Sequence, residues 1–148
     1  METSELIKSL GVKLGIQLKP NDDGFYSFEA DDLAITIFDL LELDSIALNG
    51  DLGLPPPEAP EALYKAMLEA NHLFRDTNGA TISLNPDNGH IEICKALHCK
   101  LMDADLFFTE VERFVNLMEV WSNLVKNYRG SSSDDSIPSL DTRGFMQV

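Results

Sequence analysis

Four residues in the second half of the chain carry side chains that commonly bind metal ions, namely His90, Cys94, His98 and Cys99. The apolar pattern around them favours an extended strand. Residues four positions apart in a strand are separated by roughly 13 Å, whereas zinc ligands lie about 2.0–2.3 Å from their ion. The segment also has no C-x-x-C pair. We therefore expect a half-buried strand with a small apolar cysteine and exposed imidazoles, and neither a metal nor another cofactor.

Acidic residues occur in pairs at Asp22-Asp23 and Asp31-Asp32. Both pairs fall in predicted turns, where aspartate is favoured because its side chain bonds to nearby backbone. The run Asp103-Ala104-Asp105 is similar to the start of a calcium loop, but Phe107 and Phe108 stand where a ligand and the turn glycine belong. The sequence contains no G-x-S-x-G, P-loop or G-x-G-x-x-G motif. We therefore expect that the protein is not an enzyme.

The composition is that of one globular domain with a strongly acidic surface. The chain has 148 residues, 44% of which are hydrophobic, and a mass of 16.4 kDa. Acids outnumber bases 25 to 11, and the resulting formal net charge of -14 repels nucleic acids and anionic membranes. No apolar run approaches the ~20 residues that span a bilayer, and the acidic N-terminus does not read as a signal peptide. We expect a cytosolic protein that neither binds nucleic acid nor inserts into a membrane.

The periodicity of the apolar residues predicts three helices and five strands. Thr3 or Ser4 can cap the first helix, Pro60 suits the first turn of the second, and Asn78-Gly79 is a stop signal for it. The predicted elements in chain order are a helix at 3–14, strands at 25–29, 33–41 and 45–52, a helix from 60 to the stop at 78–79, strands at 80–85 and 91–97, and a helix at 103–128.

These elements predict an α+β fold, a two-layer sandwich in the order α-β-β-β-α-β-β-α with an antiparallel sheet and helices mainly on one face. The last helix has an apolar stripe that should face the sheet, with Trp121 in register with Phe114, Met118 and Val125. We assign residues 1–129 to a single domain. Residues 130–148 are polar, rich in Ser and Asp and unpatterned, so we predict a disordered tail there.

The predicted strands at 25–29, 33–41 and 45–52 are joined by short turns and should form an antiparallel meander. This meander is both apolar and free of basic residues. Residues 20–64 contain 11 acids and no Lys or Arg. One interpretation is solubility, because acids keep a β-rich surface from aggregating. The other is a binding face in which acids surround apolar pockets. Composition alone leaves both open.

Several strings resemble one family of proteins. They are MLEANHLF at residues 67–74 followed by GATISLNP at residues 79–86, Leu14-Gly15-Ile16 after the first helix, and Glu119-Val120-Trp121 in the last helix. Together with the element order, the small size and the acidity, they resemble the class I chaperones of bacterial type III secretion, the Tir-chaperone (CesT) family. The resemblance covers roughly residues 4–128 and leaves out the tail.

The resemblance implies a non-enzymatic homodimer in the bacterial cytosol. Such chaperones bind an extended segment near the N-terminus of a secreted effector and keep it ready for export without ATP. An extended segment can add a strand to a sheet edge while its apolar side chains enter pockets. The alternative from another functional class is a regulatory protein of the same fold that sequesters a transcription activator or anti-activator.

The resemblance also implies two sets of site residues. The residues expected to bind the partner lie in the first helix and the meander: Leu6, Leu10, Phe25, Phe28, Ile35 and Ile37. The residues expected at the dimer interface lie in the second helix and the strand after it: Leu63, Met67, Ala70, Ile82 and Leu84. Each of these residues can equally belong to the core. Asn71 is unfavourable within a helix, and it can either bond to backbone near the following turn or sit at the dimer contact.

Overall fold

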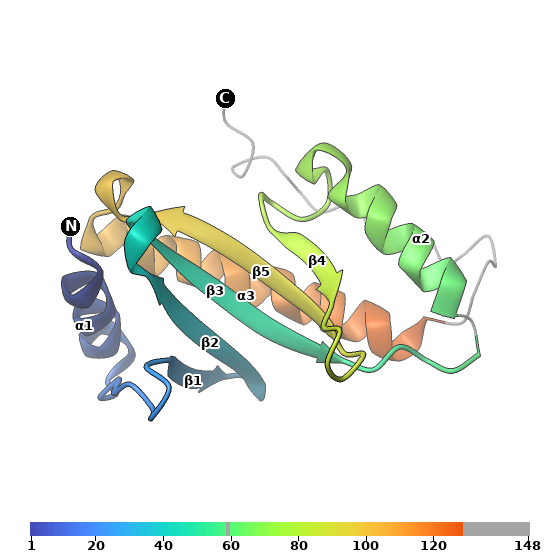
Figure 1. The fold of residues 1–148 in the computed structure, drawn as a ribbon, viewed down its shortest axis with the longest axis horizontal. Coiled ribbons are helices and arrows are strands. Elements are labelled where there is room, and N and C mark those ends of the chain that lie inside the picture. Colours follow the sequence, from blue (N-terminus) through green and yellow to red (C-terminus); the bar gives the residue numbers. More distant parts are fainter. Residues whose placement is uncertain (59, 129–148) are drawn as a thin grey trace. The chain divides into compact units, whose positions relative to one another are not determined.

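The computed structural model describes residues 1–58 and 60–128 and contains three α-helices and a five-stranded sheet (Figure 1). The strands lie in the order β1-β2-β3-β5-β4, so β1 and β4 are the two edges. The elements are α1 (Thr3–Leu14), β1 (Tyr26–Ala30), β2 (Leu33–Leu40), η1 (Leu41–Leu43), β3 (Ser45–Gly53), α2 (Pro60–Asn71), η2 (His72–Phe74), β4 (Thr81–Leu84), β5 (Ile91–His98), η3 (Cys99–Leu101) and α3 (Ala104–Asn127), where η marks a 3-10 turn. This arrangement confirms the predicted α+β fold and its element order.

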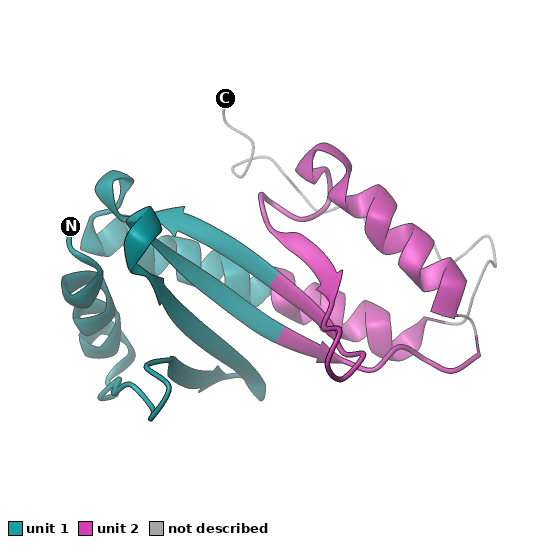
Figure 2. Ribbon diagram, viewed as in Figure 1, with its two compact units in different colours: residues 1–50, 94–116 teal, residues 51–93, 117–148 magenta. Residues whose placement is uncertain are grey.

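The chain divides into two compact units (Figure 2). Unit 1 contains residues 1–50 and 94–116, and unit 2 contains residues 51–93 and the chain from Leu117. β3, β5 and α3 contribute residues to both units. The single domain assigned to residues 1–129 stays a prediction, and the predicted tail at 130–148 lies outside the described residues.

The core of unit 1 includes residues of α1 and of the first two strands. β1 and β2 pair antiparallel with Phe28 opposite Ile35, which buries both side chains together with Ile37. Leu6 and Leu10 of α1 are fully buried in the same unit. Spacing by four places both leucines on one face of the helix, as the apolar periodicity predicted.

The first helix begins at Thr3 as predicted, but its N-cap is one residue before the two predicted caps. Glu2 is the N-cap, and its side chain and that of Glu5 form a reciprocal capping box. Thr3 is therefore already inside the helix, where it is buried and hydrogen-bonds to Cys99 Sγ (3.2 Å). Neither Thr3 nor Ser4 is the cap, because the glutamate pair satisfies the free N–H groups that a hydroxyl would otherwise bond.

In unit 2 the second helix ends at Asn71, well before the predicted stop at Asn78-Gly79. Leu73 and Phe74 have left-handed backbone angles (φ 54° and 55°), which turn the chain out of the helix. Both side chains are exposed, so Phe74 does not extend the buried face of Leu63, Met67 and Ala70. The helix signal was misleading because the chain turns here at apolar residues rather than at glycine.

The C-terminal part of α3 supplies the large core residue of unit 2. Trp121 is 1% exposed, and its indole N–H donates to the carbonyl of Asp76 (3.1 Å). Met118 and Val125 are buried on the same stripe. The predicted burial of Trp121 is therefore confirmed, and its hydrogen bond ties the chain after α2 to α3. Among the described residues, no helix is long and apolar enough to cross a membrane.

Candidate functional site: the groove between α1 and β1

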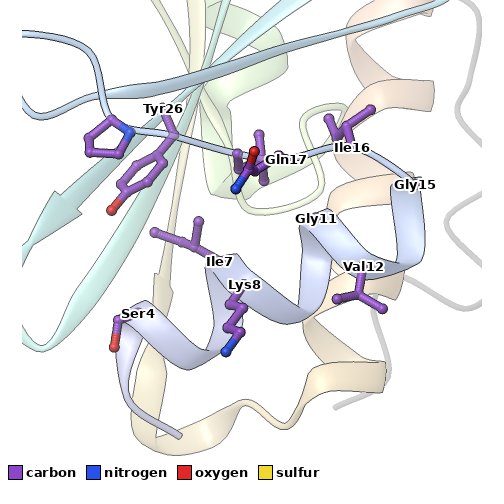
Figure 3. A pocket seen from close by; sticks show the side chains of 11 residues that line it. Ser4, Ile7, Lys8, Gly11, Val12, Gly15, Ile16, Gln17 and Tyr26 are labelled. Carbon is purple, nitrogen blue, oxygen red and sulfur yellow. The ribbon is translucent and has the colours of Figure 1, made fainter.

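A groove of about 610 Å³ opens on the surface of unit 1 (Figure 3). One wall is α1, and the other is the segment that leads from α1 into β1. Figure 3 shows Ile7 on the helix and Tyr26 in the first strand on facing elements. The residues that line the groove are Ser4, Ile7, Lys8, Gly11, Val12, Gly15, Ile16, Gln17, Leu18, Pro20 and Tyr26.

Two glycines build this groove by reversing the chain at the end of α1. Gly15 takes a left-handed conformation (φ 69°) and ends the helix. The Ile16 N–H then donates to the Gly11 carbonyl (3.0 Å), which lays the following segment back along the helix. A Cβ on Gly11 would lie 2.9 Å from the Ile16 oxygen, so only glycine fits here without a shift. The spacing of four between the glycines is a signal that could have identified the groove from sequence.

We expect Gly11→Ala to destabilise the protein by about 1–3 kcal/mol, the usual cost of overpacking. In an ordinary helix the change from glycine to alanine stabilises the protein by up to about 1 kcal/mol. A loss of stability would therefore itself show the tight contact at Gly11. Val12→Ala, at a neighbouring side chain that is 77% exposed, is the control and should change stability by less than about 0.5 kcal/mol. Urea unfolding of both variants measures the difference, and a stabilised Gly11→Ala protein would contradict the geometry.

The groove adjoins the free edge of the sheet. β1 is the outermost strand on its side, and Tyr26 belongs both to this strand and to the groove lining. Ser27 and Glu29 are exposed on the same strand. An extended segment can therefore pair with β1 through its backbone and place a side chain against Ile7, Ile16 or Tyr26.

Charges of opposite sign lie along this surface. Lys8 is the one charged residue that lines the groove. Exposed acids lie on β1 and on either side of it, namely Glu29 on the strand and Asp22, Asp23, Asp31 and Asp32 beside it. A partner segment that runs along the groove and β1 would meet a positive charge at the groove and negative charges at the strand. This arrangement favours a partner with an acidic residue at the groove and basic residues along the strand.

Ion pairs join several elements of unit 1. Lys13 of α1 contacts Asp105 of α3 at 2.9 Å, and the hydrogen bond and charge of Lys13 lower the pKa of Asp105. Lys95 of β5 and Arg113 both contact the largely buried Glu110 at 2.9 Å. Burial acts to raise the pKa of Glu110, but these two cations outweigh it and hold that pKa below its ordinary value. The carboxylate therefore stays charged and joins β5 to α3.

None of the six residues predicted to bind the partner lines the groove, and most of them are buried. Leu6, Leu10, Ile35 and Ile37 are fully buried and Phe28 is 7% exposed. Phe25 is half-buried with its ring 4.4 Å from that of Phe38. Sequence reasoning missed the residues that line the groove, because it followed the apolar stripe of α1 and the exposed wall is made by the chain reversal after it. The partner-binding role of the six residues stays a prediction.

Most of the residues predicted for the dimer interface are also buried. Leu63, Met67, Ala70 and Ile82 are buried within unit 2, whereas Leu84 is 45% exposed. Their role in a dimer stays a prediction. Three large apolar residues on α2 and the turn after it are exposed and were not in that set: Leu68, Leu73 and Phe74.

The potential metal ligands are engaged in other contacts. His90 Nδ1 lies 2.9 Å from an Asp51 oxygen, and His98 Nδ1 lies 3.0 Å from Ser45 Oγ. Cys99 is buried against Thr3. Within residues 1–58 and 60–128, no group of three or more His, Cys, Asp and Glu side chains is arranged to hold a metal ion.

Solved structures show the same fold. A chain of the ExsC-ExsE complex is 14% identical with a TM-score of 0.71, and the match covers 87% of this chain and 100% of that chain. A chain of the HopA1-SchA chaperone-effector complex is 18% identical with a TM-score of 0.66, and covers 81% of this chain and 92% of that one. A chain of the ExoU-SpcU complex from the type III secretion system of Pseudomonas aeruginosa is 17% identical with a TM-score of 0.63, over 81% and 95%.

Sequence comparison assigns the family. A comparison with curated protein sequences gives no match. The model of the Tir chaperone protein (CesT) family matches residues 5–122, which include every described helix and strand except the start of α1 and the end of α3. This match extends over most of the chain and agrees with the resemblance carried by the strings at 67–74 and 79–86. The chain therefore belongs to the Tir chaperone protein (CesT) family.

Proposed function

We propose that this protein is a cytosolic chaperone that binds an extended N-terminal segment of a type III secretion effector and keeps it ready for export without ATP. The observation that carries the proposal is the groove of unit 1 beside the free edge of β1, in a chain of the Tir chaperone family. Matching structures include complexes whose names pair a chaperone with an effector. Such a surface suits a non-enzymatic role, because it offers backbone pairing and an apolar groove.

The chemistry of the surface describes the partner segment. An apolar side chain in the groove should supply most of the affinity, since full burial of one such side chain contributes about 1.5–3 kcal/mol. Basic residues of a partner segment that pairs with β1 would face the acids at positions 22–32 of this chain, and this attraction would speed encounter. An acidic residue of the partner segment, next to the apolar side chain that enters the groove, would face Lys8.

The test of this proposal is capture of the partner from a bacterium with an active type III system. The tagged chain should co-purify a secreted protein, and limited proteolysis of the complex should leave a protected segment near the N-terminus of that protein. Adding ATP should neither be needed for binding nor release the partner. Capture of a transcription activator or anti-activator instead would replace the proposal with the regulatory alternative.

We also propose that the protein is a homodimer through the exposed apolar residues of unit 2. Leu68, Leu73, Phe74 and Leu84 lie on α2, the turn after it and β4, with 45–77% of each side chain exposed. Large exposed apolar side chains grouped on adjoining elements mark a surface that another chain covers. α2 and β4 are adjoining because Asn71 hydrogen-bonds to Ile82.

We expect Leu68→Asp to convert the dimer to a folded monomer, because a carboxylate at the centre of an apolar interface loses its hydration. The matched control is Leu101→Asp, since both leucines are 70% exposed but Leu101 lies in unit 1. Light scattering at micromolar concentration should give twice the 16.4 kDa chain mass for wild type and control, and the chain mass for Leu68→Asp. A wild-type protein that scatters as a single chain would refute the dimer.

A further inference from the structure

The end of α2 carries an arrangement that partner binding does not explain. Asn71 Nδ2 donates to the Ile82 carbonyl, and Asn71 Oδ1 accepts the Ile82 N–H, both at 2.9 Å. One side-chain amide thus makes with Ile82 the two bonds that a residue of a neighbouring strand would make. Ile82 belongs to β4, the edge strand at the other end of the strand order from β1.

The hairpin geometry shows which side of β4 Asn71 occupies. The Asn85 N–H donates to the His90 carbonyl across the hairpin (2.8 Å), so the backbone groups of Asn85 face β5. Backbone groups alternate in direction along an antiparallel strand, so those of Ile82 and Leu84 face away from β5. Asn71 therefore bonds to Ile82 on the free edge of β4.

This edge lacks the residues that usually protect one. β4 reads Thr-Ile-Ser-Leu, with no charged residue and no proline, and Thr81, Ser83 and Leu84 are exposed. Edge strands without such protection accept strands from other chains.

The surroundings hold Asn71 in this position. The helix ends immediately after it, and the Asp76 N–H returns to the Ala70 carbonyl (3.2 Å). The carbonyl of Asp76 in turn accepts the Trp121 indole N–H (3.1 Å). The left-handed Leu73 and Phe74 between these contacts are unfavourable for residues other than glycine, and such strain persists only where the surrounding contacts impose it.

We propose that Asn71 closes the free edge of β4 to incoming strands and so leaves β1 as the edge that accepts a partner segment. The closing of β4 stands on the contacts of Asn71 alone, and the assignment of the partner to β1 rests on the proposed function. A side-chain amide suits this task because it satisfies both Ile82 groups without extending the sheet. A partner strand would have to displace two good hydrogen bonds to pair there.

The test compares Asn71→Ala with Asn71→Asp. Alanine leaves the Ile82 N–H and carbonyl open. Aspartate keeps an acceptor for the N–H and adds a negative charge that opposes an incoming strand. The probe is a fluorescent peptide with the sequence of residues 80–85, which matches β4. We expect the peptide to bind the alanine variant at least 10-fold more tightly than the wild type or the aspartate variant, and sedimentation to show larger species for alanine alone.

A folded alanine variant that neither binds the peptide nor self-associates more than wild type would overturn the proposal. So would equal peptide binding and equal self-association by both variants, because Asn71 would then only support the helix end. If the alanine variant does not fold, hydrogen exchange on the wild type decides the matter. The Ile82 amide should be strongly protected, and exchange at the rate of an unpaired amide would refute its closure.

The same variants separate this inference from the proposed function. The alanine variant should retain wild-type affinity for an effector segment, because that segment pairs with β1. If the wild type binds no effector but the Asn71→Ala variant still self-associates more than the wild type, the proposed function is refuted and the inference about the edge of β4 stands. An effector affinity that changes with Asn71→Ala but not with Ile16→Asp in the groove beside β1 would instead place the partner on β4 and overturn the inference.

Discussion

Trp121→Ala is expected to destabilise the protein by about 3–5 kcal/mol, the range for removing a large buried aromatic side chain. The ring is 1% exposed in unit 2, so its loss leaves a cavity that the surrounding side chains fill incompletely. The Asp76 carbonyl also loses the donor 3.1 Å away. Because globular proteins are typically stable by only about 5–15 kcal/mol, the change removes a large share of the total. Urea unfolding followed by circular dichroism measures it.

Trp121→Phe serves as the control because it keeps an aromatic ring and removes the indole N–H. It should cost less than the alanine variant, and the difference separates packing from the hydrogen bond to Asp76. A stable, folded Trp121→Ala protein that has lost only partner binding would contradict the structural role of this residue.

Ile16→Asp is expected to weaken effector binding roughly 10- to 100-fold, the equivalent of losing one buried apolar contact of about 1.5–3 kcal/mol. Ile16 is 45% exposed and lines the groove of unit 1, so the change removes a contact without opening the core. The affinity of the captured effector segment can be measured by calorimetry. The melting temperature should change little, because an exposed side chain contributes little to folding.

Leu101→Asp is the control for this variant as well, since Leu101 is exposed in unit 1 but does not line the groove. It should bind the segment with wild-type affinity. If Ile16→Asp also binds normally, the partner lies elsewhere. The buried set Leu6, Leu10, Ile35 and Ile37 would need a rearrangement of unit 1 to reach a partner, so substitutions there should reduce stability first.

The sequence by itself determined the number and order of the helices and strands and, apart from the end of the second helix, their approximate limits. Helical and strand periodicities are local properties, so the first helix at 3–14 and the stripe around Trp121 followed directly from the spacing of apolar residues. The strings at 67–74 and 79–86, taken together with two shorter strings, the element order, the small size and the acidity, gave the resemblance to the family whose model matches residues 5–122.

The tertiary structure alone decided which apolar residues are exposed and where the second helix ends. Periodicity predicts that a face is buried but not which neighbouring segment covers it, so the wall formed by Ile16 over Gly11 was missed. The end of α2 depends on contacts with residues far along the chain, Ile82 for Asn71 and Trp121 for the carbonyl of Asp76. Those contacts fix a left-handed turn at Leu73 and Phe74 that local propensity disfavours, because several bonds made together outweigh the preference of two residues.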